Sequence, residues 1–384
     1  VCPVCIPDCA GRICGEDPVC GKPCGEPCPS DEFCGPAGQC MTAEEPAEVQ
    51  SSPAYVRDAP QAAAAIEGRF SDSDRGTATY EVPIAVPPGR GGAQPNPSLR
   101  YSGTRDNGLL GVGWSLQGLS TITRCPALAT VESYARPVDL TDSDRFCLDG
   151  KRLVAVRDSQ YGAPEAEYRT EIDTFARIRS YGQTEGGGPE YFKVWTQSGD
   201  ILSYGATADS SEYANVSTGL KRTWALKTIE RRNGSVITVE YANRTCQHID
   251  RCDDSQWLGS LEIHPTRIRY GGHPAQGIAD DRYVEFIYGH ERPDPITGFV
   301  RGVGYERTRL LRRIDTFAQG RRVRSYSLAY GTDAGDGSGS ETAANGQSIL
   351  TELYECAPTN SESDLCKRPT RFAYYEDFGL GGGE

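Results

Sequence analysis

The sequence has no long apolar run. No stretch approaches the roughly 18 to 20 consecutive apolar residues that a membrane-spanning helix needs. No apolar region typical of a signal peptide is visible, and the chain begins at Val1 without a methionine. We therefore expect no membrane-spanning segment, and we interpret the chain as a processed protein or a fragment of a longer one.

Positive charge is scarce. Six Lys and 34 Arg are outweighed by 53 acidic residues, which leaves a net charge of -13 and an isoelectric point near 5.0. A chain with this balance is repelled at long range by the phosphates of nucleic acids and of anionic lipids. The composition argues against nucleic acid as a partner.

Sequence signatures of catalysis are missing as well. There is no hydrolase elbow, no P-loop and no His-Glu-x-x-His motif. The one Glu-x-Glu pair, Glu165 and Glu167, has no recognisable partner strand, and chance explains it best. The four histidines all stand in loop-like contexts: His248, His264, His273 and His290. We expect no catalytic residues, no cofactor and no enzyme activity.

Two acidic loops are the places where a hard cation would be sought. One contains Asp139, Asp142 and Asp144, and the other contains Asp333 and Asp336. Neither has the ligand spacing and terminal Glu of an EF-hand loop. Solvated turns are favoured over calcium sites, and we predict no metal ligands.

Cysteine is abundant and unevenly distributed. Of the 15 cysteines, nine lie in the first 40 residues, where a packed core is too small to hold a fold alone. Disulfides are the favoured interpretation. Zinc is the alternative, because Cys2 and Cys5 have Cys-x-x-Cys spacing, but the other gaps are irregular and no His lies in the segment.

The other six cysteines form three local pairs, each of which would close a loop in an oxidising compartment. His248 lies between the two members of the middle pair, so half of a metal site is the alternative there. The expected disulfides are Cys125 with Cys147, Cys246 with Cys252, and Cys356 with Cys366.

Strand patterns dominate the rest of the chain. With 44 Gly and 25 Pro the composition favours short elements joined by turns. Apolar residues alternate with polar ones in several segments, and Asn233-Gly234 is a strong hairpin signal because both residues tolerate positive φ. We predict an all-β fold of successive antiparallel hairpins in a winding sheet, preceded by a small disulfide-rich knot.

Changes in composition divide the chain into four parts. Residues 1–40 are the Cys-rich knot, and 41–75 have the composition of a flexible linker with one helical turn at Ala62 to Ala65. Residues 76–376 are the β domain. Residues 377–384 are glycine-rich and are interpreted as the start of a linker to a region downstream.

The most distinctive stretch lies between residues 82 and 124. Prolines and glycines around 87–92 forbid regular strand pairing, and the glycines near 108–113 let the backbone approach an indole closely. A structural corner is the interpretation from physics alone. The motif residues are Pro88, Gly89, Arg90, Gly91, Gly113, Trp114 and Arg124.

This stretch resembles the N-terminal domain shared by the SpvB virulence protein and the B component of the Tc insecticidal toxin complexes. That family carries a similar Pro-Gly-Arg-Gly-Gly segment and a similar Gly-x-Gly-Trp-Ser-Leu segment. The Cys-rich start departs from the family pattern and is similar to segments of myxobacterial surface proteins. Further matching segments are 146–153, 195–205, 224–241, 286–294 and 326–330.

The resemblance implies a non-catalytic structural module of a secreted, extracellular Tc-like or Rhs-like protein, forming part of a β shell around or in front of a payload. Its implied partners are downstream propeller and YD/Rhs-type repeats of the same protein, and other toxin-complex subunits. A cell-surface adhesion or carbohydrate-binding module is the alternative, for which Tyr191, Tyr204 and Trp257 are the candidate exposed aromatics.

Overall fold

The fold was analysed in a computed structural model. It describes residues 32–34, 40–42, 61–72, 76–103, 106–156, 159–249, 255–289, 292–331, 346–359 and 364–374. The chain divides into two units, Val1–Gln50 and Ser51–Glu384. In these described ranges, no helix has the length and apolarity needed to cross a membrane.

The first unit is described at two short strands. β1 (Glu32–Cys34) pairs antiparallel with β2 (Cys40–Thr42), with Cys34 opposite Cys40. The other cysteines of the predicted knot lie outside the described residues. Its disulfides, and the zinc alternative, therefore stay predictions.

The second unit is built almost entirely of strands. Within the described residues, its helical segments are the single turn α2 (Ala129–Glu132) and the 3-10 turns η1 (Arg90–Gly92), η2 (Cys246–Ile249) and η3 (Pro274–Gln276). The described strands are β3 (Gln61–Ala65), β4 (Arg69–Asp72), β5 (Ala78–Pro83), β6 (Ser98–Ser102), β7 (Asn107–Gly108), β8 (Gly111–Val112), β9 (Trp114–Gln117), β10 (Thr121–Cys125), β11 (Arg145–Leu148), β12 (Lys151–Ala155), β13 (Glu167–Thr170), β14 (Arg177–Tyr181), β15 (Tyr191–Trp195), β16 (Ile201–Tyr204), β17 (Ser211–Asn215), β18 (Leu220–Glu230), β19 (Val236–Thr245), β20 (Ser260–Gly272), β21 (Arg282–Tyr288), β22 (Ile296–Val300), β23 (Val303–Arg307), β24 (Leu311–Ala318), β25 (Arg321–Tyr330), β26 (Leu350–Ala357), β27 (Leu365–Arg368) and β28 (Thr370–Arg371).

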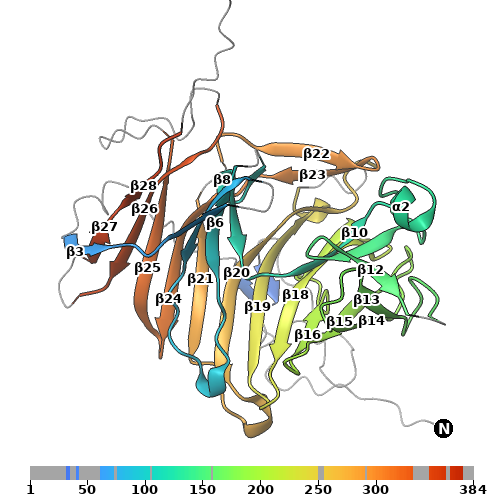
Figure 1. The fold of residues 1–384 in the computed structure, drawn as a ribbon, viewed down its shortest axis with the longest axis horizontal. Coiled ribbons are helices and arrows are strands. Elements are labelled where there is room, and N and C mark those ends of the chain that lie inside the picture. The colour runs from blue at the N-terminus through green and yellow to red at the C-terminus, as the bar shows by residue number, and fades with distance from the viewer. Residues whose placement is uncertain are drawn as a thin grey trace, which may run out of the picture. The chain divides into compact units, whose positions relative to one another are not determined.

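One long sheet runs through the second unit. Within the described residues it contains 18 strands, and most neighbours in the sheet are also neighbours in the chain, paired antiparallel. Figure 1 shows β19, β20, β21, β24 and β25 side by side. The predicted all-β fold of successive antiparallel hairpins is confirmed.

Glycine turns join these strands as the sequence predicts. β18 and β19 are joined through Asn233 and Gly234, and Gly234 has a φ of +81°. Gln319 and Gly320 connect β24 to β25 with φ values of +51° and +72°. Turns with positive φ match the twist of the flanking strands, so they set the hairpin register.

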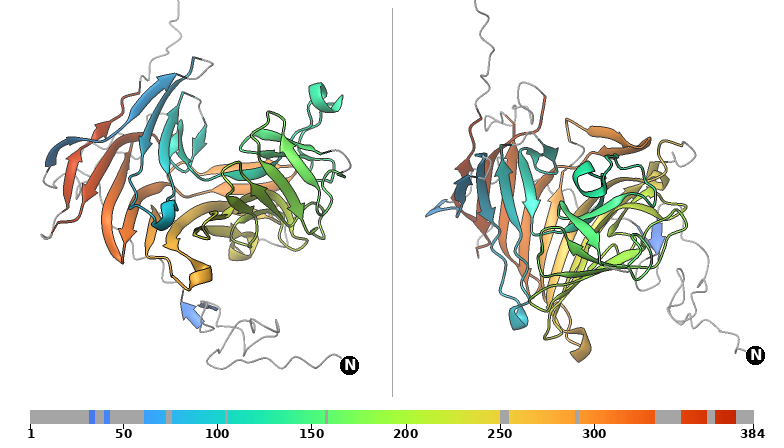
Figure 2. Two further views of the ribbon diagram at one scale, coloured as in Figure 1. Left: turned by 60° about the horizontal axis from the view of Figure 1, so that its bottom comes forward. Right: turned by 45° about the vertical axis from the view of Figure 1, so that its right-hand side comes forward.

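The strands from β10 to β18 close on themselves. β10 pairs with β11 on one side and with β18 on the other, while β16 also pairs with β18, so the chain of neighbours forms a ring (Figure 2). The ring encloses its own core. Its buried residues are Ile122, Phe146, Leu148, Leu153, Ala166, Tyr168, Ala176, Ile178, Phe192, Val194, Tyr204, Trp224 and Leu226.

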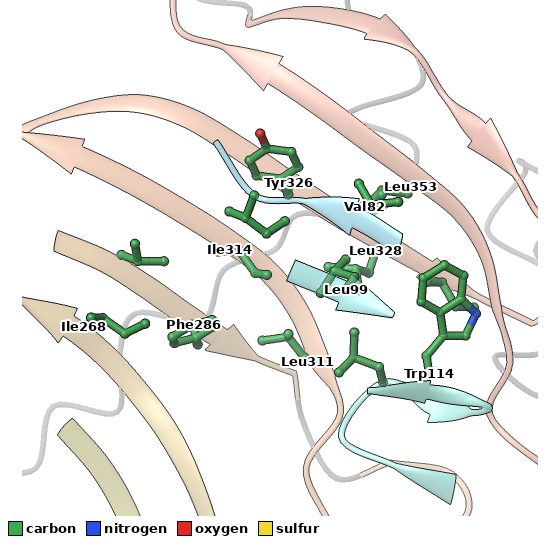
Figure 3. Packing of buried hydrophobic residues seen from close by; sticks show 14 of the residues in the cluster. Val82, Leu99, Trp114, Ile268, Phe286, Leu311, Ile314, Tyr326, Leu328 and Leu353 are labelled. Atoms are coloured by element: carbon green, nitrogen blue, oxygen red, sulfur yellow. The ribbon is translucent and has the colours of Figure 1, made fainter. Parts of the chain in front are cut away.

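A second, smaller sheet packs against the long one. Its strands follow the order β4-β5-β6-β9, and Val82, Leu99 and Trp114 project from it into a shared core. The long sheet supplies residues such as Ile268, Phe286, Ile314 and Leu328 (Figure 3). The distinctive stretch at 82–124 therefore supplies one layer of a two-layer sandwich.

The predicted linker over 41–75 is wrong for its described part. The alanine run does not form a helical turn. It forms β3, which pairs parallel with β27, and β4 then pairs antiparallel with β5. Alanine has no strong preference for a strand, but the edge of β27 offers unpaired backbone groups, and pairing with them overrides the local preference.

Two of the expected disulfides lie in the described part of the chain. Cys125 is joined to Cys147 between β10 and β11, and Cys356 is joined to Cys366 between β26 and β27. Cys246 is also disulfide-bonded. Its expected partner, Cys252, lies outside the described residues.

Removing the Cys356–Cys366 bridge by a double serine substitution should lower the free energy of unfolding by about 2 to 3 kcal/mol, because the unfolded chain regains the freedom of a closed loop. The bridged residues are 10 apart, whereas Cys125 and Cys147 are 22 apart. Urea unfolding should show an equal or larger loss for the Cys125 and Cys147 double variant. Unchanged stability in both would contradict the assignment of these bridges as stabilising.

Candidate functional site

The Glu-x-Glu pair noted in the sequence, Glu165 and Glu167, forms ion pairs with arginines of the same chain. The Glu167 carboxylate lies 2.8 Å from Arg177 and 3.0 Å from Arg169, and Glu165 lies 3.5 Å from Arg179. Among the residues that the structure describes, no group of three or more His, Cys, Asp or Glu side chains is placed to hold a metal ion. The motif residues of the 82–124 stretch are therefore the next candidates.

The Pro-Gly-Arg-Gly segment makes a bend that lies against the long sheet. The Tyr270 hydroxyl donates to the carbonyl of Pro87 at 2.8 Å, and Asn233 donates to the carbonyl of Gly91 at 2.8 Å. The Arg90 guanidinium lies 2.6 Å from the Asp281 carboxylate. Pro88 is exposed at the outside of this bend.

Two glycines make the bend possible. Gly91 has a φ of +59°, which side chains disfavour. A Cβ on Gly89 would lie 1.8 Å from the carbonyl oxygen of Ala93, so no larger residue fits without moving the backbone. The structural-corner interpretation of this segment agrees with its contacts.

Trp114 anchors the small sheet to the end of the described chain. Its indole N–H donates to the Tyr374 hydroxyl at 2.9 Å, and that hydroxyl donates to the carbonyl of Leu350 at 2.7 Å. The indole also packs edge-on to Phe372, with ring centroids 4.7 Å apart. A residue from the start of the domain thus binds residues about 260 positions later.

Replacing Gly113 with alanine should destabilise this anchor. Gly113 has a φ of +78°, and an added Cβ would lie 2.6 Å from the Tyr101 ring. Backbone strain of this kind costs about 1 to 3 kcal/mol, and the clash adds to it. Gly320 is the matched control, because its φ is +72° but nothing lies within 4 Å of an added Cβ. Thermal unfolding should show a clearly larger loss for Gly113→Ala than for Gly320→Ala, and equal losses would contradict the close contact.

A buried ion pair forms a second link, which we call the Arg292 clamp: Arg292, Asp294, Asn107 and Ser348. The Arg292 side chain is fully buried, and its Nε lies 2.9 Å from Asp294. It also donates to the carbonyl of Gly108 at 2.9 Å and to the side-chain oxygen of Asn107 at 2.7 Å.

Asp294 is the centre of this clamp. Its carboxylate accepts hydrogen bonds from Arg292, from the Asn107 amide at 3.0 Å, from the Ser348 backbone N–H at 2.8 Å and from the Ser348 hydroxyl. Burial alone would raise the pKa of Asp294, but these bonds outweigh it and lower the pKa to about 2. The clamp holds together three segments that are far apart in the sequence.

Asn107 and Ser348 are not marked by the sequence as members of the clamp. The available signal is Arg292-Pro293-Asp294, in which opposite charges flank a proline within a segment that matches the family. The partners on the other two segments carry no local sign of their role. Only their approach in space identifies them.

Acid should weaken the Arg292 clamp through Asp294. Because the folded-state pKa of Asp294, about 2, lies below its ordinary value, the charged form stabilises the fold. This contribution is fully present above about pH 4 and is lost as the pH falls through 2. Between pH 4 and 2, melting temperatures should fall less steeply for Asp294→Asn than for the wild type; parallel curves would contradict the role of Asp294.

Arg124 forms a third link, at one end of the ring. Its guanidinium lies 3.2 Å from Asp144 and donates to the carbonyls of Lys221 at 2.8 Å, Thr141 at 2.8 Å and Gly187 at 3.2 Å. Burial lowers the pKa of Arg124 and raises that of Asp144. The expectation that the acidic loop at 139–144 is a solvated turn is wrong for Asp144, because the buried arginine draws its carboxylate inward.

The three aromatics predicted to be exposed lie in different settings. Tyr204 is 1% exposed and donates to Ser120 inside the ring, so its predicted exposure is wrong. It lies at the end of β16, directly after a shift of register, and belongs to the same ring core as Trp224. Trp257 packs against Phe299, and Tyr191 stacks on Tyr181.

The fold and these contacts define a class: an all-β module in which a glycine- and proline-rich motif ties a small sheet over a long one. The family model of SpvB, the Salmonella virulence plasmid 65kDa B protein, matches residues 72–285, more than half of the chain. The chain belongs to this family. None of the curated proteins matches the sequence.

Solved structures show the same fold. The TcdB2-TccC3 crystal structure matches with a TM-score of 0.62 and 16% identity, covering 82% of this chain and 17% of that one. The Photorhabdus luminescens Tc holotoxin pore matches with a TM-score of 0.61 and 16% identity, covering 82% and 16%. The N-terminal domain of SpvB from Salmonella typhimurium matches with a TM-score of 0.55 and 16% identity, covering 72% and 99%.

These matches confirm the resemblance drawn from the 82–124 stretch. The chain is a module of the SpvB family whose fold is like that of the SpvB N-terminal domain and of TcdB2-TccC3, and it spans less than one fifth of the length of TcdB2-TccC3.

Proposed function

We propose that the chain is a non-catalytic structural module of a secreted Tc-like or YD/Rhs-repeat protein, in which it forms part of a β shell around or in front of a payload. The observation that carries this proposal is the likeness to TcdB2-TccC3 over 82% of the chain. The interior contacts support it, because Arg90, Arg124 and Arg292 each join segments distant in the sequence.

The proposed partners follow from the same likeness. They are propeller and YD/Rhs-type repeats downstream in the same polypeptide, and further toxin-complex subunits. An extracellular location is supported by the disulfides at Cys125–Cys147 and Cys356–Cys366, since such bridges persist in oxidising compartments.

Limited proteolysis of the complete secreted polypeptide tests the shell role. We expect a downstream segment to resist protease in the intact protein and to be cleaved once the clamp variant Asp294→Ala has loosened the shell. Mass spectrometry of the fragments identifies the protected segment. If no segment is protected in the intact protein, the shell role is wrong.

A separate assay tests the absence of catalysis. The chain alone should not hydrolyse NAD, and it should not transfer the ADP-ribose group of NAD to another molecule. If it does so, and the double variant Glu165→Gln and Glu167→Gln abolishes the activity, the module is an enzyme and the non-catalytic proposal fails.

A further inference from the structure

The outer face of β14 and β15 carries an alternating row of aromatic and basic side chains. Along β15 the buried Phe192 and Val194 face the ring core, while Tyr191, Lys193 and Trp195 are partly exposed on the other side. β14 supplies the opposing row of Arg177, Arg179 and Tyr181. We call these six residues the outer platform.

The pairs across the two strands are of two kinds. Tyr181 stacks on Tyr191 with centroids 5.0 Å apart, and the Arg177 guanidinium lies 5.3 Å from the centroid of the Trp195 ring. Between them Arg179 stands directly opposite Lys193. The aromatic pairs stabilise the strands, whereas like charges directly opposite each other destabilise them.

The like-charge pair stands out in a chain with a net charge of -13. Glu165 and Glu167 approach Arg179 from one side, at 3.5 and 3.9 Å, while Lys193 lies over the Tyr181 ring at 5.9 Å. Arg177 is likewise paired with Glu167, at 2.8 Å. Lys193 is thus the platform cation that forms no ion pair with a carboxylate among the described residues, and an anionic group bound beside it would supply that partner.

A polar pocket adjoins the platform at Tyr191. Its cavity of about 290 Å³ is lined by Thr184, Glu190, Tyr191, Thr207, Tyr213 and Lys221, among others. The Lys221 ammonium donates to the carbonyls of Glu190 at 2.7 Å and Gly205 at 3.1 Å and lies 5.7 Å from the centroid of the Tyr213 ring. Burial lowers the pKa of Lys221 to about 8, so this group is still mainly a cation at neutral pH.

We propose that the outer platform and its pocket bind an acidic polysaccharide whose sugars carry carboxylates. Lys193 and Arg179 face a uronate carboxylate, the aromatic rings pack on sugar C–H faces, and the end sugar enters the pocket. The hydroxyls of Thr184 and Thr207 donate to Gly187 and Asp209, so their oxygens, like the Glu190 carboxylate, act as acceptors for the hydroxyl groups of a sugar ring. This proposal does not depend on the shell role.

Nucleic acid is the less favoured ligand. Both polymers carry one negative charge per sugar, so the acidic net charge of the protein repels both and does not separate them. The pocket separates them, because its hydroxyl groups and the Glu190 carboxylate suit a polyhydroxylated ring.

Binding of the chain to polygalacturonate, dextran and single-stranded DNA tests the proposal. We expect saturable binding to polygalacturonate that weakens with salt, and at least tenfold weaker binding to dextran and to DNA. Absence of binding to polygalacturonate would overturn the proposal. Equal or tighter binding to DNA would replace the polysaccharide by nucleic acid.

The variant Lys193→Glu separates a binding role from a structural one. It turns the like-charge pair with Arg179 into an attractive pair, so the melting temperature should stay unchanged or rise while polygalacturonate affinity falls at least tenfold. Lys151→Glu makes the same charge change at an exposed position on β12 and should leave the affinity within twofold of wild type. Equal effects of both variants would contradict a specific site.

Tyr191→Ala provides a second measurement at the junction of platform and pocket. The loss of its ring should weaken polygalacturonate binding at least fivefold. Tyr134→Ala removes an exposed tyrosine elsewhere and serves as its control. If Tyr191→Ala binds as wild type does, the aromatic part of the proposal is wrong.

Discussion

Replacing Asp294 with alanine should lower the free energy of unfolding by about 3 to 5 kcal/mol, because it leaves a buried arginine without its counter-charge. The Arg292 side chain is 0% exposed and that of Asp294 is 12% exposed, so the guanidinium has little access to water in place of the lost carboxylate. The substitution also removes the acceptor for Asn107 and for the backbone of Ser348. The segments that the clamp joins should separate from one another early in unfolding.

Urea unfolding followed by tryptophan fluorescence measures this loss. Asp281→Ala is the matched control, since Asp281 also pairs with an arginine, Arg90, at 2.6 Å, but the Arg90 side chain is 48% exposed. Exposed ion pairs contribute about 0 to 1 kcal/mol. If Asp281→Ala and Asp294→Ala lose equal stability, burial of the clamp is not what makes it strong.

Replacing Arg124 with alanine should lower the free energy of unfolding by about 3 to 5 kcal/mol, because the Asp144 carboxylate would remain buried in the ring without a cation. Both side chains are 1% exposed. Three carbonyl oxygens, on Lys221, Thr141 and Gly187, would also lose their donor. The end of the ring where these three segments meet should be the region most affected.

A double-mutant cycle with Asp144→Asn measures the coupling between the two residues. The double variant should be less destabilised than the sum of the single variants, since it leaves no unpaired charge. Burial already raises the pKa of Asp144, so without Arg124 this carboxyl should take up a proton more readily. The difference in free energy of unfolding between Arg124→Ala and the wild type should therefore shrink as the pH falls. A buried ion pair would be contradicted if the losses of unfolding free energy were additive and if the difference between Arg124→Ala and the wild type did not change with pH.

Local sequence patterns predicted much of the fold. The alternation along β5, β19 and β21 and the Asn233-Gly234 turn are readable because strand faces and turn conformations depend on near neighbours. The Cys125–Cys147 and Cys356–Cys366 bridges were also readable, because each spans a short loop. The glycine- and proline-rich motif indicated a corner and the family.

Other features could not be read from local patterns. The alanines of β3 form a strand only because β27, about 300 residues later, presents a free edge. Tyr204 and Asp144 were expected at the surface, but the ring directs one inward and Arg124 draws in the other. Of the outer platform, the sequence singled out Tyr191 alone, because the two rows become a surface only when β14 and β15 pair.

By itself the sequence determined the all-β class, the hairpin turns and the family, since these depend on period-two alternation, on residues that tolerate positive φ and on a short motif. Tertiary structure alone decided that β18 closes the ring onto β10, that the small sheet covers the long one, and that Arg292 meets Asn107 and Ser348. These contacts join residues far apart in the chain. Their energy comes from burying charge and apolar surface together, which no single segment can specify.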